Sequence, residues 1–133
     1  IKRALEQKLK VVFCVGESLT QYKQGKSIPY IIKQITKAFD NSINLKKIII
    51  AYEPIWAIGT NVTPKMQEID YIHYKIKEAM KKHFNIIKIP ILYGGSVKAA
   101  NSADIFSLKN VDGGLIGGAS LIASEFCKIY DTL

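Results

Sequence analysis

The sequence predicts an α/β fold built on a parallel sheet, because apolar, β-branched segments alternate with helical patterns along the chain. Four segments are predicted to be buried strands: residues 11–15, 48–52, 89–93 and 111–116. Each leads into a loop that contains Gly, Pro or Ser, and a helical pattern follows. Strands that are joined through helices run parallel to one another, so the helices should cover the sheet.

The helical patterns have recognisable beginnings. They are expected at residues 1–9, 27–41, 63–83, 101–108 and 120–130. Pro29 stands in the first turn of the second helix, where its missing N–H costs nothing. Thr63 is the predicted N-cap of the third helix and Pro64 its first residue. The first pattern has neither a cap nor an initial Met, so we expect the sequence to be a piece of a longer protein.

The composition indicates one folded domain spanning residues 1–133. Of these residues 48% are hydrophobic and 23% are charged, which is typical of globular proteins. No segment approaches the ~20 apolar residues needed to cross a bilayer, and no secretory leader opens the sequence, so we expect a cytoplasmic protein without a membrane partner. Cys14 and Cys127 lack metal-ligand spacing and are expected to be reduced and partly buried.

The net charge of +8 raises the alternative of a nucleic-acid-binding protein. The lysines are dispersed along the chain, and Arg3 is the single arginine among 19 basic residues. Surfaces that read bases normally rely on Arg, because a guanidinium group can form two parallel hydrogen bonds to a base edge. We therefore expect no nucleic-acid partner, since only the net charge favours one.

Glu53 is the one charged residue in the apolar segment 48–58. An ionised carboxylate among apolar neighbours is costly unless it is paired, solvated or used in catalysis. Pro54 ends the preceding strand, so the carboxylate is expected at the carboxyl end of a strand, where α/β folds present reactive groups. The pattern alone favours a solvated side chain. The apolar loop at residues 56–60 favours the catalytic alternative, because such a loop can exclude water from a site.

Paired glycines follow the last two predicted strands, at Gly94-Gly95 and Gly117-Gly118. Without a Cβ, their backbone N–H groups can approach an anion closely, and the helix that follows adds a favourable dipole. A single Gly-Gly pair is ordinarily a tight turn. Two pairs at successive strand ends are the arrangement with which closed barrels bind phosphate after their last two strands. They therefore favour a barrel over an open sheet.

Four motifs together closely resemble the triosephosphate isomerase family. They are residues 51–60 (AYEPIWAIGT), 93–97 (YGGSV), 111–120 (VDGGLIGGAS) and 14–17 (CVGE). The resemblance runs from about residue 8 to the last helix. It implies a TIM (β/α)8 barrel, of which this chain would supply the last four βα units, a half barrel.

By this resemblance Glu53 is the catalytic general base. It would move a proton between adjacent carbons of dihydroxyacetone phosphate and glyceraldehyde 3-phosphate through an enediol intermediate, in glycolysis and gluconeogenesis, with no metal and no cofactor. Residues 55–63 would form a lid, with Glu17 bracing Trp56 when the lid is open. The phosphate would be held by backbone N–H groups of Gly59, Ser96, Gly117 and Gly118. The lid and its support would comprise Cys14, Glu17, Trp56, Thr60 and Tyr93.

The sequence departs from the family pattern at several places. The lid is about two residues shorter than the common form, with Asn61 where Gly is usual. Gly114 replaces a bulky apolar residue, which should weaken packing of the last strand. The family's electrophilic histidine and its substrate-binding lysine and asparagine belong to the first half of the barrel. His73 and His83 lie in a helical pattern, where we expect them to be partly exposed and unable to replace that histidine.

The family forms homodimers, and the loop that makes the dimer lies in the first half as well. We therefore expect a triose phosphate and a second copy as partners of the whole protein. These 133 residues alone should be inactive, because the groups that stabilise developing charge are absent. The alternative is a non-catalytic half-barrel remnant that binds phosphate or self-associates through its exposed strand edges.

Overall fold

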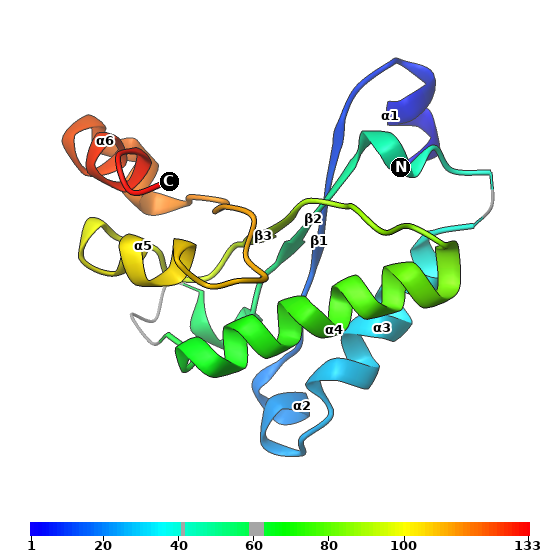
Figure 1. The fold of residues 1–133 in the computed structure, drawn as a ribbon, viewed down its shortest axis with the longest axis horizontal. Helices are drawn as coiled ribbons and strands as arrows, with labels where there is room; N and C mark the ends of the chain where they lie inside the picture. The colour runs from blue at the N-terminus through cyan, green and yellow to red at the C-terminus, as the bar shows by residue number, and fades with distance from the viewer. Residues whose placement is uncertain (41, 59–62) are drawn as a thin grey trace.

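The computed structural model describes residues 1–40, 42–58 and 63–133 (Figure 1). Its sheet has three parallel strands in spatial order, β1 (Val11–Val15), β2 (Ile48–Tyr52) and β3 (Ile91–Tyr93). Val15 pairs with Tyr52, and Tyr52 pairs with Tyr93. The three strands therefore end side by side, and the residues that follow them share one edge of the sheet.

The prediction for the strands is confirmed for β1 and β2 and needs correction for the other two segments. β3 begins at Ile91 rather than residue 89. Residues 111–116 form only an isolated bridge between Gly114 and Tyr93. The Asp112 carboxylate accepts the Ile91 N–H at 2.8 Å, a position that a ladder carbonyl would otherwise take. Gly113 has a φ of 141°, so the backbone leaves the extended conformation there.

The missing bulk at Gly114 is compensated by a neighbouring ring. A Cβ placed on Gly114 would lie 2.9 Å from two ring carbons of Phe106 and 2.9 Å from Cδ1 of Ile116. The space that a larger side chain would take is therefore filled from α5 and from the segment itself. The packing stays dense although the strand is reduced to a bridge.

The described residues form six α-helices and three short 3₁₀ helices. They are α1 (Lys2–Glu6), α2 (Leu19–Lys23), α3 (Ser27–Ala38), α4 (Met66–Phe84), α5 (Ala99–Phe106) and α6 (Ala123–Tyr130), with η1 (Leu45–Lys47), η2 (Ile55–Ala57) and η3 (Gly118–Leu121). The sequence did not predict α2. The predicted start of the long helix was wrong, because α4 begins at Met66 after an extended Lys65 (φ −60°, ψ 144°). The Glu68 carboxylate accepts the Lys65 N–H at 3.1 Å and so caps this start.

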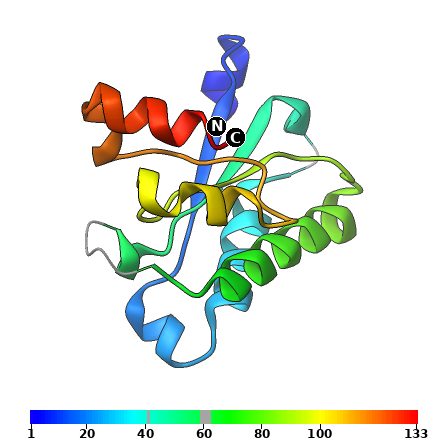
Figure 2. The ribbon, with the colours of Figure 1, turned by 60° about the vertical axis from the view of Figure 1, so that its left-hand side comes forward.

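The helices lie in two groups around the sheet. α3 and α4 pack against each other on one side, and α5 and α6 lie together next to β3 (Figures 1 and 2). α3 and α4 bury apolar stripes against the strands, and this core includes Ile31, Ile35, Ile69, Ile76, Met80, Ile48, Ile50 and Ile91. Each such side chain contributes about 1.5–3 kcal/mol when it is fully buried.

The outer edge of β1 has no neighbouring strand among the described residues. Val12 on this strand and Leu9 just before it are 43% and 57% exposed. A second exposed apolar group surrounds α6 and comprises Leu121, Ile122, Phe126, Tyr130 and Leu133. Strands of parallel sheets are normally covered on both faces, so this apolar surface is unusually open for a parallel sheet.

Candidate active site

Glu53 stands where the three strands end. Its N–H donates to the Val15 carbonyl at 2.7 Å, and the Gly94 N–H donates to the Tyr52 carbonyl at 2.8 Å. These two bonds continue the sheet one residue beyond β2 on both sides. The backbone at Glu53 is therefore fixed by both neighbouring strands, although its side chain remains half-buried.

Two glycines make room for Glu53. A Cβ on Gly16 would fall 1.7 Å from the Glu53 carbonyl oxygen, so only glycine fits at this position directly after β1. A Cβ on Gly94 would fall 2.6 Å from Cγ of Glu53 and 3.2 Å from its Oε1. The Glu53 side chain thus lies directly over the backbone of Gly94, toward β3.

Cys14 lies beside this carboxylate. Partial burial, followed by the hydrogen bond to Glu53 and its negative charge, raises the pKa of the Cys14 thiol to about 11. Cys14 is therefore a neutral thiol at physiological pH. Both Cys14 and Cys127 are free, and both residues are exposed overall although the Cys14 thiol is partly desolvated beside Glu53, so the expectation of partly buried residues was wrong.

A buried carboxylate holds the turn after Glu53. Glu17 is fully buried, and its Oε1 accepts the Tyr52 hydroxyl at 3.2 Å and the Trp56 Nε1–H at 2.9 Å. The Ile55 N–H donates to the Glu17 carbonyl at 3.1 Å. Burial, and then the charge of Glu17, raise the pKa of Tyr52, so its hydroxyl stays a donor. The structure thus brings Glu17 and Trp56 together, as the resemblance implies for an open lid.

Tyr22 and Glu68 join this cluster, although no sequence motif pointed to either residue. The Tyr22 ring stacks on Trp56 with centroids 4.2 Å apart and an interplanar angle of 28°. The Tyr22 hydroxyl lies 3.3 and 3.4 Å from the two carboxylate oxygens of Glu68. α2 is five residues long, and the contact joins residues 46 apart, so no local pattern could have indicated it.

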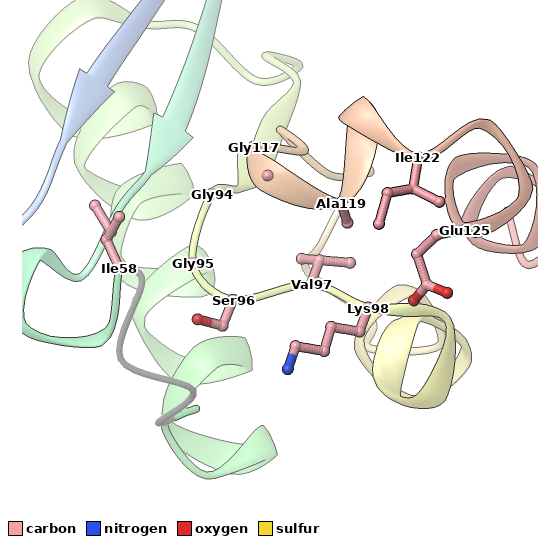
Figure 3. A pocket seen from close by; sticks show the side chains of 11 residues that line it. Ile58, Gly94, Gly95, Ser96, Val97, Lys98, Gly117, Ala119, Ile122 and Glu125 are labelled. Carbon is pink, nitrogen blue, oxygen red and sulfur yellow. The ribbon is translucent and has the colours of Figure 1, made fainter.

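A cavity of about 470 Å³ opens beside this turn. The 94–98 loop crosses it, with Ile58 on one side and Ala119, Ile122 and Glu125 on the other (Figure 3). Three of the residues predicted to bind phosphate line it: Ser96, Gly117 and Gly118. Glu53 itself is not a lining residue, but Gly94, which its side chain covers, is one.

The cavity wall offers donors that the described protein leaves unused. None of the backbone N–H groups of Ser96, Gly117 and Gly118 donates to an acceptor among the described residues. Gly117 and Gly118 are exposed, and a Cβ on either would meet nothing within 4 Å. Backbone N–H groups that are free in a cavity wall are suited to bind an anion.

Charged residues of the cavity wall were missed by sequence reasoning. Lys98 and Glu125 both line it, and they come from the 94–98 loop and from α6. Glu125 Oε1 accepts the Ala99 N–H at 2.8 Å, which caps the start of α5. Ser96 connects the cavity to the turn after Glu53, because its Oγ donates to the Ala57 carbonyl at 2.9 Å.

Tyr93 and His73 lie beneath the strand ends. Tyr93 is fully buried, and its hydroxyl has no hydrogen-bond partner in the part of the chain that the structure describes. The His73 ring packs 5.8 Å from the Tyr52 ring and 6.4 Å from the Tyr93 ring. His73 is fully buried, so the expectation of partial exposure was wrong for it, whereas His83 is exposed. Burial lowers the pKa of His73 to about 4.

Some predictions fall on residues that the structure does not describe. Gly59, Thr60 and Asn61 lie in the gap at 59–62, outside the described residues. The described ranges contain no group of three or more His, Cys, Asp or Glu side chains that could hold a metal ion. Across the same ranges, every helix is too short or too polar to span a membrane.

Comparison with known proteins identifies the family. The family model described as triosephosphate isomerase matches residues 1–133. The chain belongs to the triosephosphate isomerase family. A triosephosphate isomerase of Hahella chejuensis is 41% identical over 133 residues, covering 98% of this chain and 54% of the relative. One of Francisella tularensis subsp. holarctica is 43% identical over 135 residues, covering 98% and 53%.

The fold agrees with the family. A crystal structure of triosephosphate isomerase from Bartonella henselae superimposes with a TM-score of 0.88 at 34% identity, and the match covers 98% of this chain and 53% of that one. The parallel strands and their covering helices are therefore part of a TIM barrel, as the sequence predicted. The chain spans about half the length of the curated relatives that it matches.

Proposed function

We propose that this chain is the C-terminal half of a triosephosphate isomerase that interconverts dihydroxyacetone phosphate and D-glyceraldehyde 3-phosphate, with Glu53 as the general base. One observation carries the proposal. The Glu53 side chain lies against Gly94, and Gly94 lines a cavity whose wall presents the free N–H groups of Ser96, Gly117 and Gly118. A carboxylate and an anion cradle therefore flank one space.

The chemistry needs one carboxylate on one face of the substrate. Glu53 removes a proton from the carbon next to the carbonyl, which leaves an enediolate and a protonated Glu53. The hydroxyl proton moves to the former carbonyl oxygen through the enediol, and Glu53 returns its proton to the former carbonyl carbon, which gives the aldose and restores the carboxylate. The ionised form is the reactive one. The Glu53 N–H donates to the Val15 carbonyl and the Gly94 N–H donates to the Tyr52 carbonyl. These bonds fix the strand ends around Glu53, which favours a constant distance between base and substrate.

The cradle positions the substrate through its phosphate. Backbone N–H groups of Ser96, Gly117 and Gly118 donate to the phosphate oxygens, and glycine at two of these positions lets the anion approach closely. Gly59 completes the set in this proposal. The Lys98 side chain adds positive charge to the same wall, which favours a dianionic ligand.

Residues 55–63 exclude water from the bound substrate in this proposal. Glu17 and Trp56 support the first part of this segment. The Tyr93 hydroxyl is buried without a partner in the described part of the chain, and in this proposal it contacts the segment when the segment closes. Exclusion of water strengthens the electrostatic interactions within the site and protects the enediol from loss of its phosphate.

The remaining catalytic groups belong to the first half of the barrel in this proposal. The family's electrophilic histidine and substrate-binding lysine stabilise charge that develops on the substrate, and such groups commonly contribute several kcal/mol each. The 133 residues alone are therefore inactive, and the whole protein is a cytoplasmic homodimer that acts in glycolysis and gluconeogenesis.

A second candidate function is favoured by the open edge of β1 and by the exposed apolar residues around α6. In it, the half barrel is complete as it stands and self-associates without catalysis. Sedimentation of the 133-residue chain at increasing concentrations tests this candidate. A defined dimer that binds inorganic phosphate but converts no triose phosphate favours it, whereas a gene product with a catalytic first half excludes it.

Glu53→Gln in the full-length protein tests the proposed base. The amide cannot accept the substrate proton, so kcat should fall by about 10²- to 10⁴-fold, while the inhibition constant of inorganic phosphate stays within about two-fold. Glu6→Gln is the matched control, because Glu6 is an exposed carboxylate on α1. Glu53→Gln with the turnover of the control would refute the proposal.

A further inference from the structure

The turn after Glu53 is contacted by a residue that lies outside the four family motifs. The Trp56 indole N–H binds Glu17, and one face of the indole is covered by the ring of Tyr22. Tyr22 belongs to α2, which follows β1, so the contact crosses from the first βα unit to the second. The stacked pair has the short separation and near-parallel planes that make aromatic contacts favourable.

The hydroxyl of Tyr22 extends this contact to the start of α4. It donates to the Glu68 carboxylate, whose Oε2 also accepts the Lys65 N–H at 3.1 Å. Desolvation, followed by the charge and hydrogen bond of Glu68 and then the charge of Glu17, raises the pKa of Tyr22, so its hydroxyl remains protonated at neutral pH. Tyr22 therefore contacts η2 with its ring and the residue that caps α4 with its hydroxyl.

We propose that Tyr22 is a positioning residue for the isomerase reaction: it fixes Trp56, and through Trp56 the backbone that carries Glu53, and it ties η2 to the beginning of α4. This inference rests on the proposed function, because the position of Trp56 matters to the reaction only if Glu53 is the base. Two residues separate Trp56 from Glu53, and one of them is Pro54, whose φ of −64° is fixed by its ring. We therefore expect a displacement of the Trp56 indole to displace the backbone of Glu53 as well.

The test compares three variants of the full-length protein. Tyr22→Leu removes the stacked ring, Tyr22→Phe keeps the ring and removes the hydroxyl, and Tyr30→Leu removes an exposed tyrosine of α3 as the matched control. Trp56 is the one tryptophan in these 133 residues, so its emission, taken as the difference from Trp56→Phe, reports on the indole directly.

Tyr22→Leu should shift the Trp56 emission to longer wavelength and lower kcat about ten-fold, with KM for dihydroxyacetone phosphate changed less than about two-fold. Tyr22→Phe should restore the emission and most of kcat, which a general loss of folding would not show. Tyr22→Leu with the emission and kcat of Tyr30→Leu would overturn the inference.

Two further results keep the test decisive. If Tyr22→Leu fails to fold, Glu68→Gln is introduced once into the unaltered protein and once into Tyr22→Phe, and the Trp56 emission of each is measured. If Tyr22 connects Trp56 to Glu68 through its hydroxyl, Glu68→Gln changes the emission only in the protein that keeps this hydroxyl. Equal changes of the Trp56 emission in both backgrounds would contradict this connection through Tyr22. If the unaltered protein has no isomerase activity, the proposed function fails by itself, and the emission still decides whether Tyr22 fixes Trp56.

Discussion

The base side and the cradle side of the candidate site are built by different means. On the base side, Glu53 extends a central strand that is paired along five residues with β1, and the buried Glu17 carboxylate holds the turn that follows. On the cradle side, β3 has three residues, and its outer neighbour is a single bridge at Gly114. The backbone that carries the proposed base is fixed by a ladder and a buried network. The N–H groups proposed to hold phosphate belong to the half-buried Ser96 and to the exposed Gly117 and Gly118.

The difference has a chemical reason. General base catalysis depends on the distance between the carboxylate and one carbon atom, so the backbone that carries Glu53 must not move. A phosphate can be held by several N–H groups that adjust to it, because each contributes a modest, directional bond. Substitutions on the base side should therefore affect turnover strongly, and substitutions on the cradle side should be tolerated unless they reach Glu53.

Among substitutions that keep a carboxylate at this position, the largest effect is expected from Glu53→Asp. The shorter side chain moves the carboxylate back toward the strand, and a misplacement of about 1 Å can lower the rate by about 10²-fold. Steady-state kinetics of the full-length protein should show this loss in kcat with phosphate inhibition unchanged. Turnover close to that of the unaltered protein would mean that the base side tolerates displacement, and the contrast between the two sides would be lost.

Gly94→Ala tests where the two sides meet. Its Cβ would fall 2.6 Å from Cγ of Glu53, and such overpacking costs about 1–3 kcal/mol. Gly118→Ala is the matched change on the cradle side, where nothing lies within 4 Å of the added methyl group. Urea unfolding should show a loss for Gly94→Ala and a change within about 0.5 kcal/mol for Gly118→Ala. Equal losses would contradict the geometry given for Gly94.

His73 makes the junction of the two sides sensitive to acid. Its ring packs between Tyr52 and Tyr93, and burial lowers its pKa from 6.5 to about 4, against the opposing influence of the Asn110 backbone, Asp112 and Asp70. The unfolded chain therefore binds the proton more readily, so stability is complete above pH 6.5 and is lost as the pH falls toward 4. The loss between pH 7.5 and pH 5 should be about 2 kcal/mol.

His73→Leu should remove this dependence, and His83→Leu, an exposed histidine on the same helix, should leave it in place. Denaturant unfolding at a series of pH values measures both. NMR titration of His73 in the folded protein tests the buried neutral ring directly. A pKa of His73 near 6.5 would rule it out.

Ser96→Ala should have the smallest effect. The hydroxyl donates to the Ala57 carbonyl at 2.9 Å and is a side-chain link between the two sides, part-buried and neutral. Loss of one such bond costs about 1 kcal/mol, so kcat should fall less than about ten-fold. A loss as large as that of Glu53→Asp would show that the cradle side is as demanding as the base side.

The sequence allowed prediction of the parts that depend on local patterns. β1 and β2 are buried apolar runs with a breaker at their ends, and their bounds were predicted correctly. The run at residues 111–116 is apolar only at its two ends. Asp112 takes a ladder position with its side chain and Gly113 turns the backbone, so the run does not form a strand. The start of α4 was set too early because Thr63-Pro64 is a good local start, whereas the Glu68 carboxylate caps Lys65.

The site was predicted where motifs carry it and missed where distant segments meet. Glu53 and the glycine pairs stood out from the residues themselves, and the family resemblance added the roles of Ser96, Gly117 and Gly118. The structure places Ser96, Gly117 and Gly118 in the wall of one cavity, and the Glu53 side chain lies against Gly94 of that wall without lining the cavity itself. The stacking of Tyr22 on Trp56 depends on how two βα units pack, which periodicity does not encode. His73 shows the same limit, since a histidine on a helix is exposed or buried according to its neighbours.

The central claim is that Glu53 moves a proton on a triose phosphate held by the glycine-lined cradle. The most direct measurement is exchange of hydrogen into dihydroxyacetone phosphate in deuterated water, followed by proton NMR with the full-length protein and with Glu53→Gln. Deuterium should enter at the carbon beside the carbonyl with the unaltered protein and not with Glu53→Gln, while both retain binding of inorganic phosphate. Exchange at the same rate with Glu53→Gln would contradict the account.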